Sequence, residues 1–204
     1  MEKSLNRDVV DEVIGLMKGF LTRDEIERIG FKKVDREVKI STKACFYQPE
    51  KISIGEGSRI DDFCILIGNI KIGKYVHIAG YSTIHASAGS VMVDDFSTLS
   101  SRVCIYSASD DYSGKYMTSP LFGKEYTSTI FSDVRLGKYV VVGTGSSILP
   151  NAEIPDGVAV GAMSLVKHAL EPWGIYAGIP ARYIKAREKG LLKLAEEFVK
   201  GKQQ

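Results

Sequence analysis

The chain has 204 residues, of which 44% are hydrophobic and 25% charged, a balance typical of a globular protein with a sizeable core. Because 27 Lys and Arg face 25 Asp and Glu, the net charge of +2 gives no reason to expect a nucleic acid or an anionic membrane as the main partner. No membrane span, secretion signal or disulfide framework is recognisable, so we expect a cytoplasmic protein.

The N-terminal region is expected to be helical. Residues 7–18 place aliphatic side chains at helical spacing, and Thr22 with Glu25 forms a capping box for a second short helix that ends near Gly30. An exposed end of a stacked β-structure promotes aggregation unless it is covered. We therefore expect residues 1–45 to form a helical cap.

A six-residue repeat dominates the middle of the chain. Three blocks carry an aliphatic residue at every sixth position: Ile54, Ile60, Leu66, Ile72, Ile78 and Ile84; Val93, Leu99 and Ile105; and Leu136, Val142, Ile148, Ile154, Val160 and Val166. This period fits neither a helix nor a simple hairpin meander. If each hexapeptide is one short strand and a turn, three of them form a coil, and equivalent side chains stack about 4.8 Å apart. The pattern predicts a three-sided parallel β-helix over residues 46–187.

The repeat is interrupted twice, by a three-residue slip between Ile84 and Val93 and by a long loop over residues 106–133. Extra residues are tolerated in a repeat only where they leave the stack. If neither interruption changes the register, Ile84 and Ile105 share one column, and His85 lies one coil below Tyr106 where the loop begins. We expect His85, the loop and Asp94 to meet in one region of the surface.

His85 is the candidate general base, because imidazole titrates near neutral pH and can take a proton from an attacking hydroxyl or amine. Carboxylates can orient a sugar or hold an ammonium group, which makes the loop a candidate acceptor site. Its proposed members are Asp94, Ser109, Asp110, Asp111 and Tyr112. The competing interpretations are a polar turn residue for His85 and a solvated loop tip for the carboxylates.

The chain becomes basic after Pro180, and Leu191, Leu192, Leu194, Ala195 and Phe198 suggest a helix over residues 188–204. We expect it to pack against a neighbouring element. His77 and His168 are expected to be ordinary surface or turn residues.

The repeat over Ile52 to Arg187, the segment at residues 105–114 and the Gly178-Ile179-Pro180-Ala181 motif resemble the hexapeptide-repeat acyltransferases. The resemblance is greatest to bacterial enzymes that acylate sugars of surface polysaccharides such as lipopolysaccharide O-antigen, including N-acyltransferases for nucleotide-linked amino sugars such as the anthrose-pathway enzyme. It implies a left-handed coil, a homotrimer with sites between subunits, and transfer of an acetyl or short acyl group from coenzyme A. The galactoside-type O-acetyltransferases carry a catalytic His in this loop, where Ser109, Asp110 and Asp111 stand here.

The same resemblance implies a coenzyme A site along the late coils. Small residues there would let the pantetheine arm approach the backbone, and basic residues would meet the phosphates. The implied residues are Gly143, Thr144, Gly145, Gly161, Ala162, Ser164, Lys167, Arg182 and Lys185.

Three other readings stay open at this stage. One is acylation of a sugar hydroxyl instead of an amine. Another is a non-catalytic scaffold, since fold does not dictate function. The last is zinc catalysis of the γ-carbonic anhydrase type, which needs three suitably spaced histidines, whereas this chain has three in total and its cysteines show no metal spacing. We therefore expect no metal.

Overall fold

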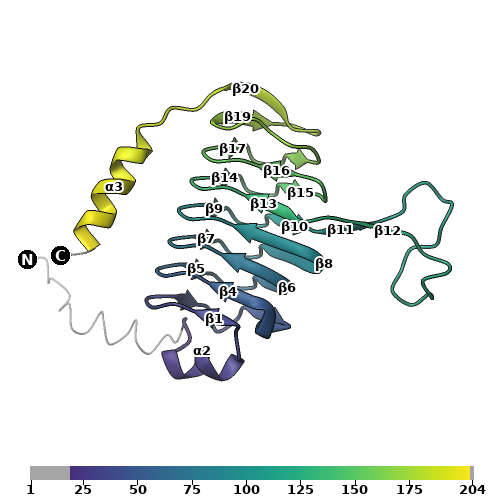
Figure 1. Ribbon diagram of the computed structural model, residues 1–204, viewed down its shortest axis with the longest axis horizontal. Coiled ribbons are helices and arrows are strands. Elements are labelled where there is room, and N and C mark those ends of the chain that lie inside the picture. The colour runs from purple at the N-terminus through teal and green to yellow at the C-terminus, as the bar shows by residue number, and fades with distance from the viewer. Residues whose placement is uncertain (1–18, 203–204) are drawn as a thin grey trace, which may run out of the picture.

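The computed structural model describes residues 19–202, which form a three-sided parallel β-helix (Figure 1). Strands β6 and β8 each bend through a corner and contribute to two walls, so three strand segments make each coil. Wall 1 contains β1 (Lys33–Val34), β4 (Ile52–Ile54), the second halves of β6 (Ile65–Ile72) and β8 (Thr83–Val93), β13 (Val134–Leu136) and β16 (Glu153–Ile154).

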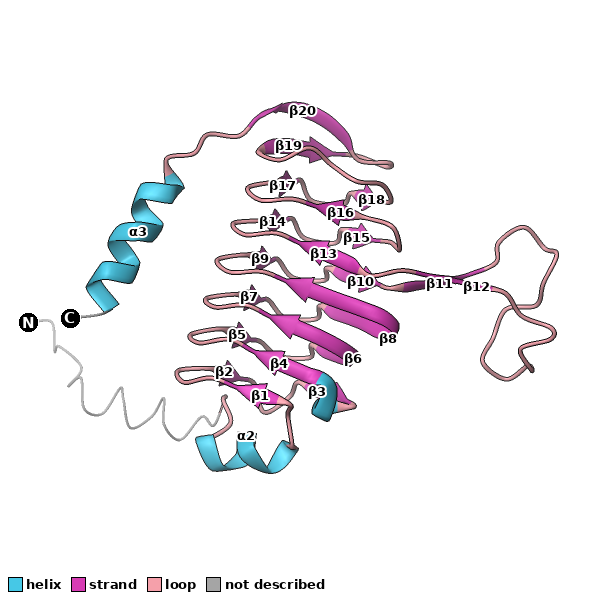
Figure 2. Cartoon of the chain, in the orientation of Figure 1, coloured by secondary structure: helices cyan, strands magenta, loops and turns pink. Residues whose placement is uncertain are grey.

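Wall 2 contains β2 (Lys39–Ile40), β5 (Arg59–Ile60), β7 (His77–Ile78), β9 (Thr98–Leu99), β14 (Val141–Val142), β17 (Ala159–Val160), β19 (Gly174–Ala177) and the antiparallel β20 (Arg182–Ala186). Wall 3 contains β3 (Cys45–Tyr47), the first halves of β6 and β8, β10 (Cys104–Tyr106), β15 (Ser147–Ile148) and β18 (Leu165–Val166). A short 3₁₀ helix, η1 (Pro49–Lys51), precedes β4. A hairpin of β11 (Ala108–Asp110) and β12 (Thr129–Phe131) projects from the three-walled β-helix, which we call the prism (Figure 2).

The core consists of the aliphatic columns that the repeat predicts. On wall 3, Ile84 pairs with Ile105, Ile105 with Ile148, and Ile148 with Val166, and all four are buried. The predicted register across both interruptions is therefore confirmed. Each of these side chains leaves water on folding, which contributes roughly 25 cal/mol per Å² of apolar surface removed from solvent.

The N-terminal end agrees in part with the expectation. Helix α2 (Arg23–Ile29) starts at the predicted capping box, in which the Glu25 amide donates to Thr22 Oγ1, and ends at Gly30 with φ of 81°. The predicted helix at residues 7–18 lies outside the described residues. Because β1 already pairs with β4, the segment 1–45 contains strands of the first coil as well as α2, so it is not solely a helical cap.

Helix α3 (Leu191–Lys202) runs along one side of the prism (Figure 1). The ring of Phe198 lies edge-on to Tyr75 at 5.1 Å between centroids, and Lys202 Nζ lies 2.8 Å from Glu37 Oε2. These contacts confirm the predicted C-terminal helix and show where it is attached. Among the described residues, no helix is long and apolar enough to span a membrane.

Candidate active site

Both interruptions of the repeat occur at the corner between walls 3 and 1, which we call the loop corner. Residues 87–89 bulge out of β8, and the hairpin leaves the next coil directly above them. A Cβ on Gly89 would lie 2.9 Å from the carbonyl oxygen of Ser132, so the bulge packs tightly against the base of the hairpin. The amide and hydroxyl of Ser90 each donate to Asp133 Oδ1 at 2.7 Å. The three extra residues of the slip thus pack against the base of the hairpin and fix its position.

His85 lies on wall 3 beside the loop corner. It pairs in register with Tyr106, as predicted, and the two rings stack with centroids 5.1 Å apart. The side chain is half-buried, and burial lowers the pKa of His85 below its ordinary value. The imidazole is therefore biased towards the neutral form that can accept a proton.

The structure does not bring Asp94 to this region. Strand β8 passes the loop corner and continues along wall 1, so Asp94 follows its last residue at the opposite edge of that wall. There it faces Arg135, with 3.8 Å between Asp94 Oδ2 and Arg135 Nη2. Within one chain, the corner between them therefore separates Asp94 from His85, and the role of Asp94 as an acceptor contact stays a prediction.

The other candidate acceptor residues lie on the hairpin. Ser109 and Asp110 belong to β11, and Thr129 Oγ1 donates to Asp110 Oδ1 at 3.1 Å across the strand pair. The Ser113 hydroxyl donates to Asp111 Oδ2 at 2.8 Å and lowers the pKa of Asp111. Both carboxylates are at the surface, and Tyr112 beyond them is 92% exposed.

The hairpin extends away from its own prism (Figure 1) and carries many large apolar side chains. Leu121 is 88% exposed, and the others in this class are Tyr112, Tyr116, Met117, Phe122, Tyr126, Ile130 and Phe131. Such a concentration of exposed apolar side chains is characteristic of a surface that contacts another molecule. The hairpin is therefore a candidate contact surface for another molecule.

The small residues of the late coils gather at the corner between walls 2 and 3, which we call the glycine corner. Gly143 with Thr144 and Gly145 follows β14, and Gly161 with Ala162 follows β17 on the next coil. A Cβ on Gly143 would lie 2.4 Å from the Ala162 amide nitrogen, so the stacking of the coils itself requires glycine there. Thr144 and Ala162 are exposed, which leaves a shallow strip of backbone accessible.

Ser164 is not part of that accessible strip. It is 3% exposed, and its Oγ accepts a hydrogen bond from the Gly178 amide at 3.0 Å. Its own amide donates to Ser146 Oγ at 3.1 Å. The Ser164 hydroxyl therefore joins consecutive coils, and a contact of Ser164 with the cofactor stays a prediction.

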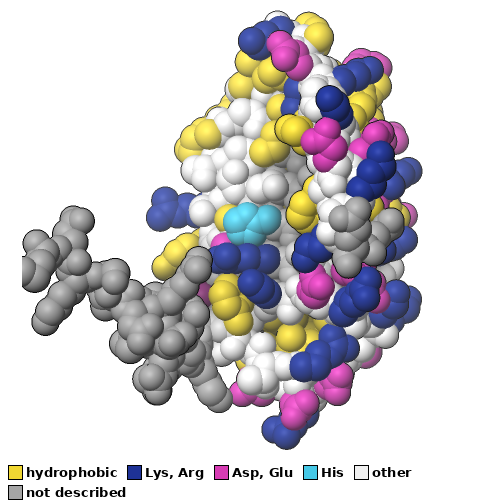
Figure 3. All heavy atoms as spheres, turned by 90° about the vertical axis from the view of Figure 1, so that its left-hand side faces the viewer, with side chains coloured by type: hydrophobic (Ala, Val, Ile, Leu, Met, Phe, Trp, Pro, Cys, Tyr) yellow, Lys and Arg dark blue, Asp and Glu magenta, His cyan; other side chains and the backbone are white. Residues whose placement is uncertain are grey.

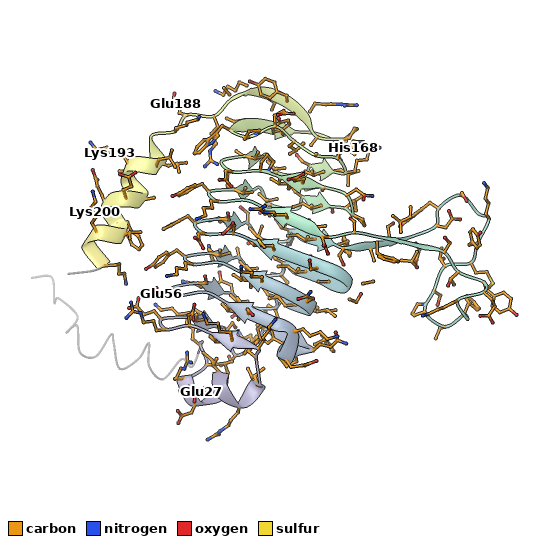
Figure 4. The ribbon with its side chains drawn as sticks, in the orientation of Figure 1. Glu27, Glu56, His168, Glu188, Lys193 and Lys200 are labelled. Carbon is orange, nitrogen blue, oxygen red and sulfur yellow. The ribbon has the colours of Figure 1, made fainter. Side chains whose placement is uncertain are left out.

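The basic residues of the last coil are divided between two places. Arg182 pairs with Ala177 and Lys185 with Ile175, so both lie on β20 above wall 2. Lys167 instead follows β18 at the far end of wall 3, next to His168, which lies on the hairpin side of the prism (Figure 4). Arg182 and Lys185 therefore lie on the wall that ends at the glycine corner, whereas Lys167 lies at the opposite end of wall 3.

A histidine–carboxylate pair on wall 2 escaped the sequence analysis. His77 Nε2 lies 2.8 Å from Asp61 Oδ2, and Arg59 Nε donates to Asp61 Oδ1 at 2.6 Å. His77 pairs with Arg59 on the preceding coil, so stepping by one coil would have placed them together. Within residues 19–202, no group of three or more His, Cys, Asp and Glu side chains is arranged to hold a metal ion.

Residues 51–86 match the family described as bacterial transferase hexapeptide (six repeats). The chain is 44% identical over 182 residues to a dTDP-4-amino-4,6-dideoxy-D-glucose acyltransferase of Escherichia coli, covering 88% of this chain and 94% of the relative. It is 30% identical over 145 residues to the lipopolysaccharide biosynthesis O-acetyl transferase WbbJ of Escherichia coli K12, covering 67% of this chain and 69% of the relative.

The fold is also similar to the crystal structure of AntD, an N-acyltransferase from Bacillus cereus, in complex with dTDP and 3-hydroxybutyryl-CoA. The TM-score is 0.90 at 44% sequence identity, with 92% of this chain and 100% of AntD covered. Similarity of this extent includes the prism and most of the flanking segments. The chain therefore belongs to the hexapeptide-repeat acyltransferases.

Proposed function

We propose that this enzyme transfers an acyl group from an acyl-coenzyme A to the amino group of a dTDP-linked amino sugar. The observation that carries the proposal is the 44% identity over 94% of the length of an enzyme named for that acceptor. The weaker similarity to WbbJ supports a place in lipopolysaccharide biosynthesis and keeps acylation of a sugar hydroxyl as the second candidate. Because coenzyme A thioesters are intracellular metabolites, we assign the reaction to the cytoplasm.

The donor is proposed to lie along the glycine corner. Small side chains at Gly143, Thr144, Gly145, Gly161 and Ala162 let the pantetheine arm approach the backbone closely. Arg182 and Lys185 on β20 would meet the phosphates at the upper end, since guanidinium and ammonium groups suit phosphate oxygens. Lys167, at the other end of wall 3, is retained as a phosphate contact only through a neighbouring subunit.

A homotrimer would complete the site. The hairpin leaves the prism at the loop corner, whereas the glycine corner lies at the other edge of wall 3. The hairpin, which carries Asp110, Asp111 and the exposed apolar residues, extends away from its own prism (Figure 1). In a closed ring of three subunits, each hairpin can therefore cover the groove of its neighbour.

The chemistry needs an amine, a thioester and a route for one proton. The acceptor nitrogen attacks the thioester carbonyl carbon, the tetrahedral intermediate collapses, the thiolate of coenzyme A leaves, and an amide bond replaces the thioester bond. His85 is proposed as the base that takes the nitrogen proton, with backbone amides stabilising the oxyanion. Ser109, Asp110, Asp111 and Tyr112 would orient the sugar, so that much of the rate comes from alignment.

Turnover with matched acceptors tests the function. Release of the coenzyme A thiol is expected with dTDP-4-amino-4,6-dideoxyglucose and acetyl- or 3-hydroxybutyryl-coenzyme A, with an amide in the product by mass spectrometry. The same nucleotide sugar with a hydroxyl in place of the amine is the control and should react at least about 100-fold more slowly. Faster reaction of the hydroxyl sugar would establish the O-acyltransferase alternative instead.

His85 is tested through the pH dependence of kcat/KM. A base works only when deprotonated, and burial lowers the pKa of His85, so the loss of rate that protonation of His85 causes should begin at a lower pH than for an ordinary imidazole. His85→Phe keeps a ring to stack on Tyr106 but removes the base, and should lower the rate at least about tenfold. If the variant loses less than about tenfold in rate and its rate declines towards low pH as in the wild type, alignment of the amine is sufficient for catalysis without His85 as a base.

A further inference from the structure

Three consecutive coils of wall 2 carry a basic side chain at the same outward position. Lys39 pairs with Arg59, and Arg59 with His77, in parallel register. Residues in register on a parallel sheet point to the same face, about 4.8 Å apart. Lys39 is exposed, and the Arg59 and His77 side chains keep 50% and 42% of their surface accessible. We call Lys39, Arg59 and His77 the basic column.

The basic column is confined to the lower coils. Its continuation upward along the same register position is uncharged, with Thr98, Val141 and Ala159. Figure 3 shows Lys and Arg side chains directly beside a histidine, below an area drawn mostly white where neutral side chains and backbone form the surface. Wall 2 therefore changes along its length from a cationic lower part to a neutral upper part.

Asp61 fixes the geometry of the column without neutralising it. Its two carboxylate oxygens accept separately from Arg59 at 2.6 Å and bond His77 at 2.8 Å. Burial opposes ionisation of Asp61, but the hydrogen bonds from His77 and Arg59 outweigh it and lower its pKa. The next carboxylate, Asp62, is engaged by Lys43 at 2.8 Å. Asp61 thus holds Arg59 and His77 together, and the exposed Lys39 adds a further basic side chain to the column.

The basic column lies on wall 2, which ends at the glycine corner where the donor is proposed to bind. The outward residues at the strand ends of wall 2 are small from Ala79 and Ser100 up to Gly143. His77 lies two coils below Val141, which precedes the strip, a distance of roughly 10 Å along the prism axis. An acceptor sugar at the level of Ser100 would lie between the donor above and the basic column below.

We propose that Lys39, Arg59 and His77 bind the diphosphate of the nucleotide-linked acceptor, an inference that rests on the proposed function. A diphosphate offers two linked anionic groups, and a column of cations one coil apart lets each phosphate meet a separate side chain. Arg59, held by Asp61 at Nε, keeps its terminal nitrogens for a phosphate. The uncharged coils above would hold the sugar, which carries no charge beyond its amine.

The test is the double variant Lys39→Gln/Arg59→Gln. Its KM for dTDP-4-amino-4,6-dideoxyglucose is expected to rise at least about tenfold, which is ~1.4 kcal/mol, while the KM for acyl-coenzyme A stays within about twofold. Calorimetry should show dTDP binding weakened by a similar factor, with a smaller dependence on salt. Lys71→Gln, an exposed charge removal on wall 1, is the control and should change neither KM.

The outcomes separate this inference from the proposed function. Three results would each overturn the proposal that the basic column binds the diphosphate. They are an unchanged dTDP affinity in the double variant, absence of dTDP binding in the wild type, and a raised KM for acyl-coenzyme A alone. Column-dependent dTDP binding by an enzyme that acylates neither acceptor would support the column and reject the proposed transfer. If the double variant is unstable, Lys39→Gln alone replaces it, because this change is at an exposed side chain. The affinity for dTDP is then expected to fall at least about threefold, which is ~0.7 kcal/mol.

Discussion

Replacing residues 108–131 with an Asn-Gly turn is expected to abolish acyl transfer while the prism stays folded. The replaced segment contributes no residue to the buried core, and Ser107 and Ser132, which are already joined by a hydrogen bond from the Ser132 amide to the Ser107 carbonyl, can be closed by a two-residue turn. Removing the groups that align the acceptor should lower kcat/KM by about 1000-fold or more, since alignment supplies much of the rate of an amine acylation. Steady-state kinetics with the amino-sugar acceptor measure the loss.

Two measurements decide what such a loss means. The melting temperature should stay within ~3 °C of the wild type, and acyl-coenzyme A should still raise it, because the glycine corner is untouched. Lys124→Ser, an exposed change on the same loop, is the control and should retain full activity. If the shortened enzyme transfers the acyl group at the wild-type rate, the hairpin is not part of the active site. If acyl-coenzyme A no longer raises its melting temperature, the hairpin contributes to the donor site instead.

The prism could be read from the sequence because its core is nearly one-dimensional. Each interior side chain, such as Ile105, contacts mainly its equivalents one coil above and below, so a fixed repeat specifies the packing. The same logic carried the register across the long loop and placed His85 beneath Tyr106. Handedness is not contained in that repeat, which is why the sequence analysis could take it only from the family resemblance.

The site was less predictable, because function depends on which corner a residue occupies. Asp94 is close to His85 in sequence, but β8 turns a corner between them. Ser164 fits the small-residue pattern, yet its hydroxyl faces inward and bonds the Gly178 amide. Only the pairing register showed that Arg59 and His77 share one column, and no single chain could show what the hairpin covers.

Ala162→Trp is expected to block the donor groove without disturbing the fold. Ala162 is exposed at the glycine corner, so the indole would project over the strip rather than into the core. We expect the KM for acyl-coenzyme A to rise at least about tenfold, ~1.4 kcal/mol, with the affinity for dTDP unchanged. His168→Trp places the same bulk on an exposed residue on the hairpin side of the prism (Figure 4) and should leave both unchanged.

Mixing this variant with the hairpin-shortened enzyme tests whether the site is shared. If the hairpin of one subunit covers the groove of the next, a mixed trimer contains sites that combine the intact hairpin of an Ala162→Trp subunit with the intact groove of a shortened subunit. Random assembly from equal amounts should make about a quarter of all sites complete. At acyl-coenzyme A concentrations well below the wild-type KM, where the Ala162→Trp enzyme keeps about a tenth of the wild-type rate or less, the mixture should therefore be more active than either variant alone. If each subunit used its own hairpin and groove, every site would keep one defect, and the co-refolded mixture would be no more active than its separate components.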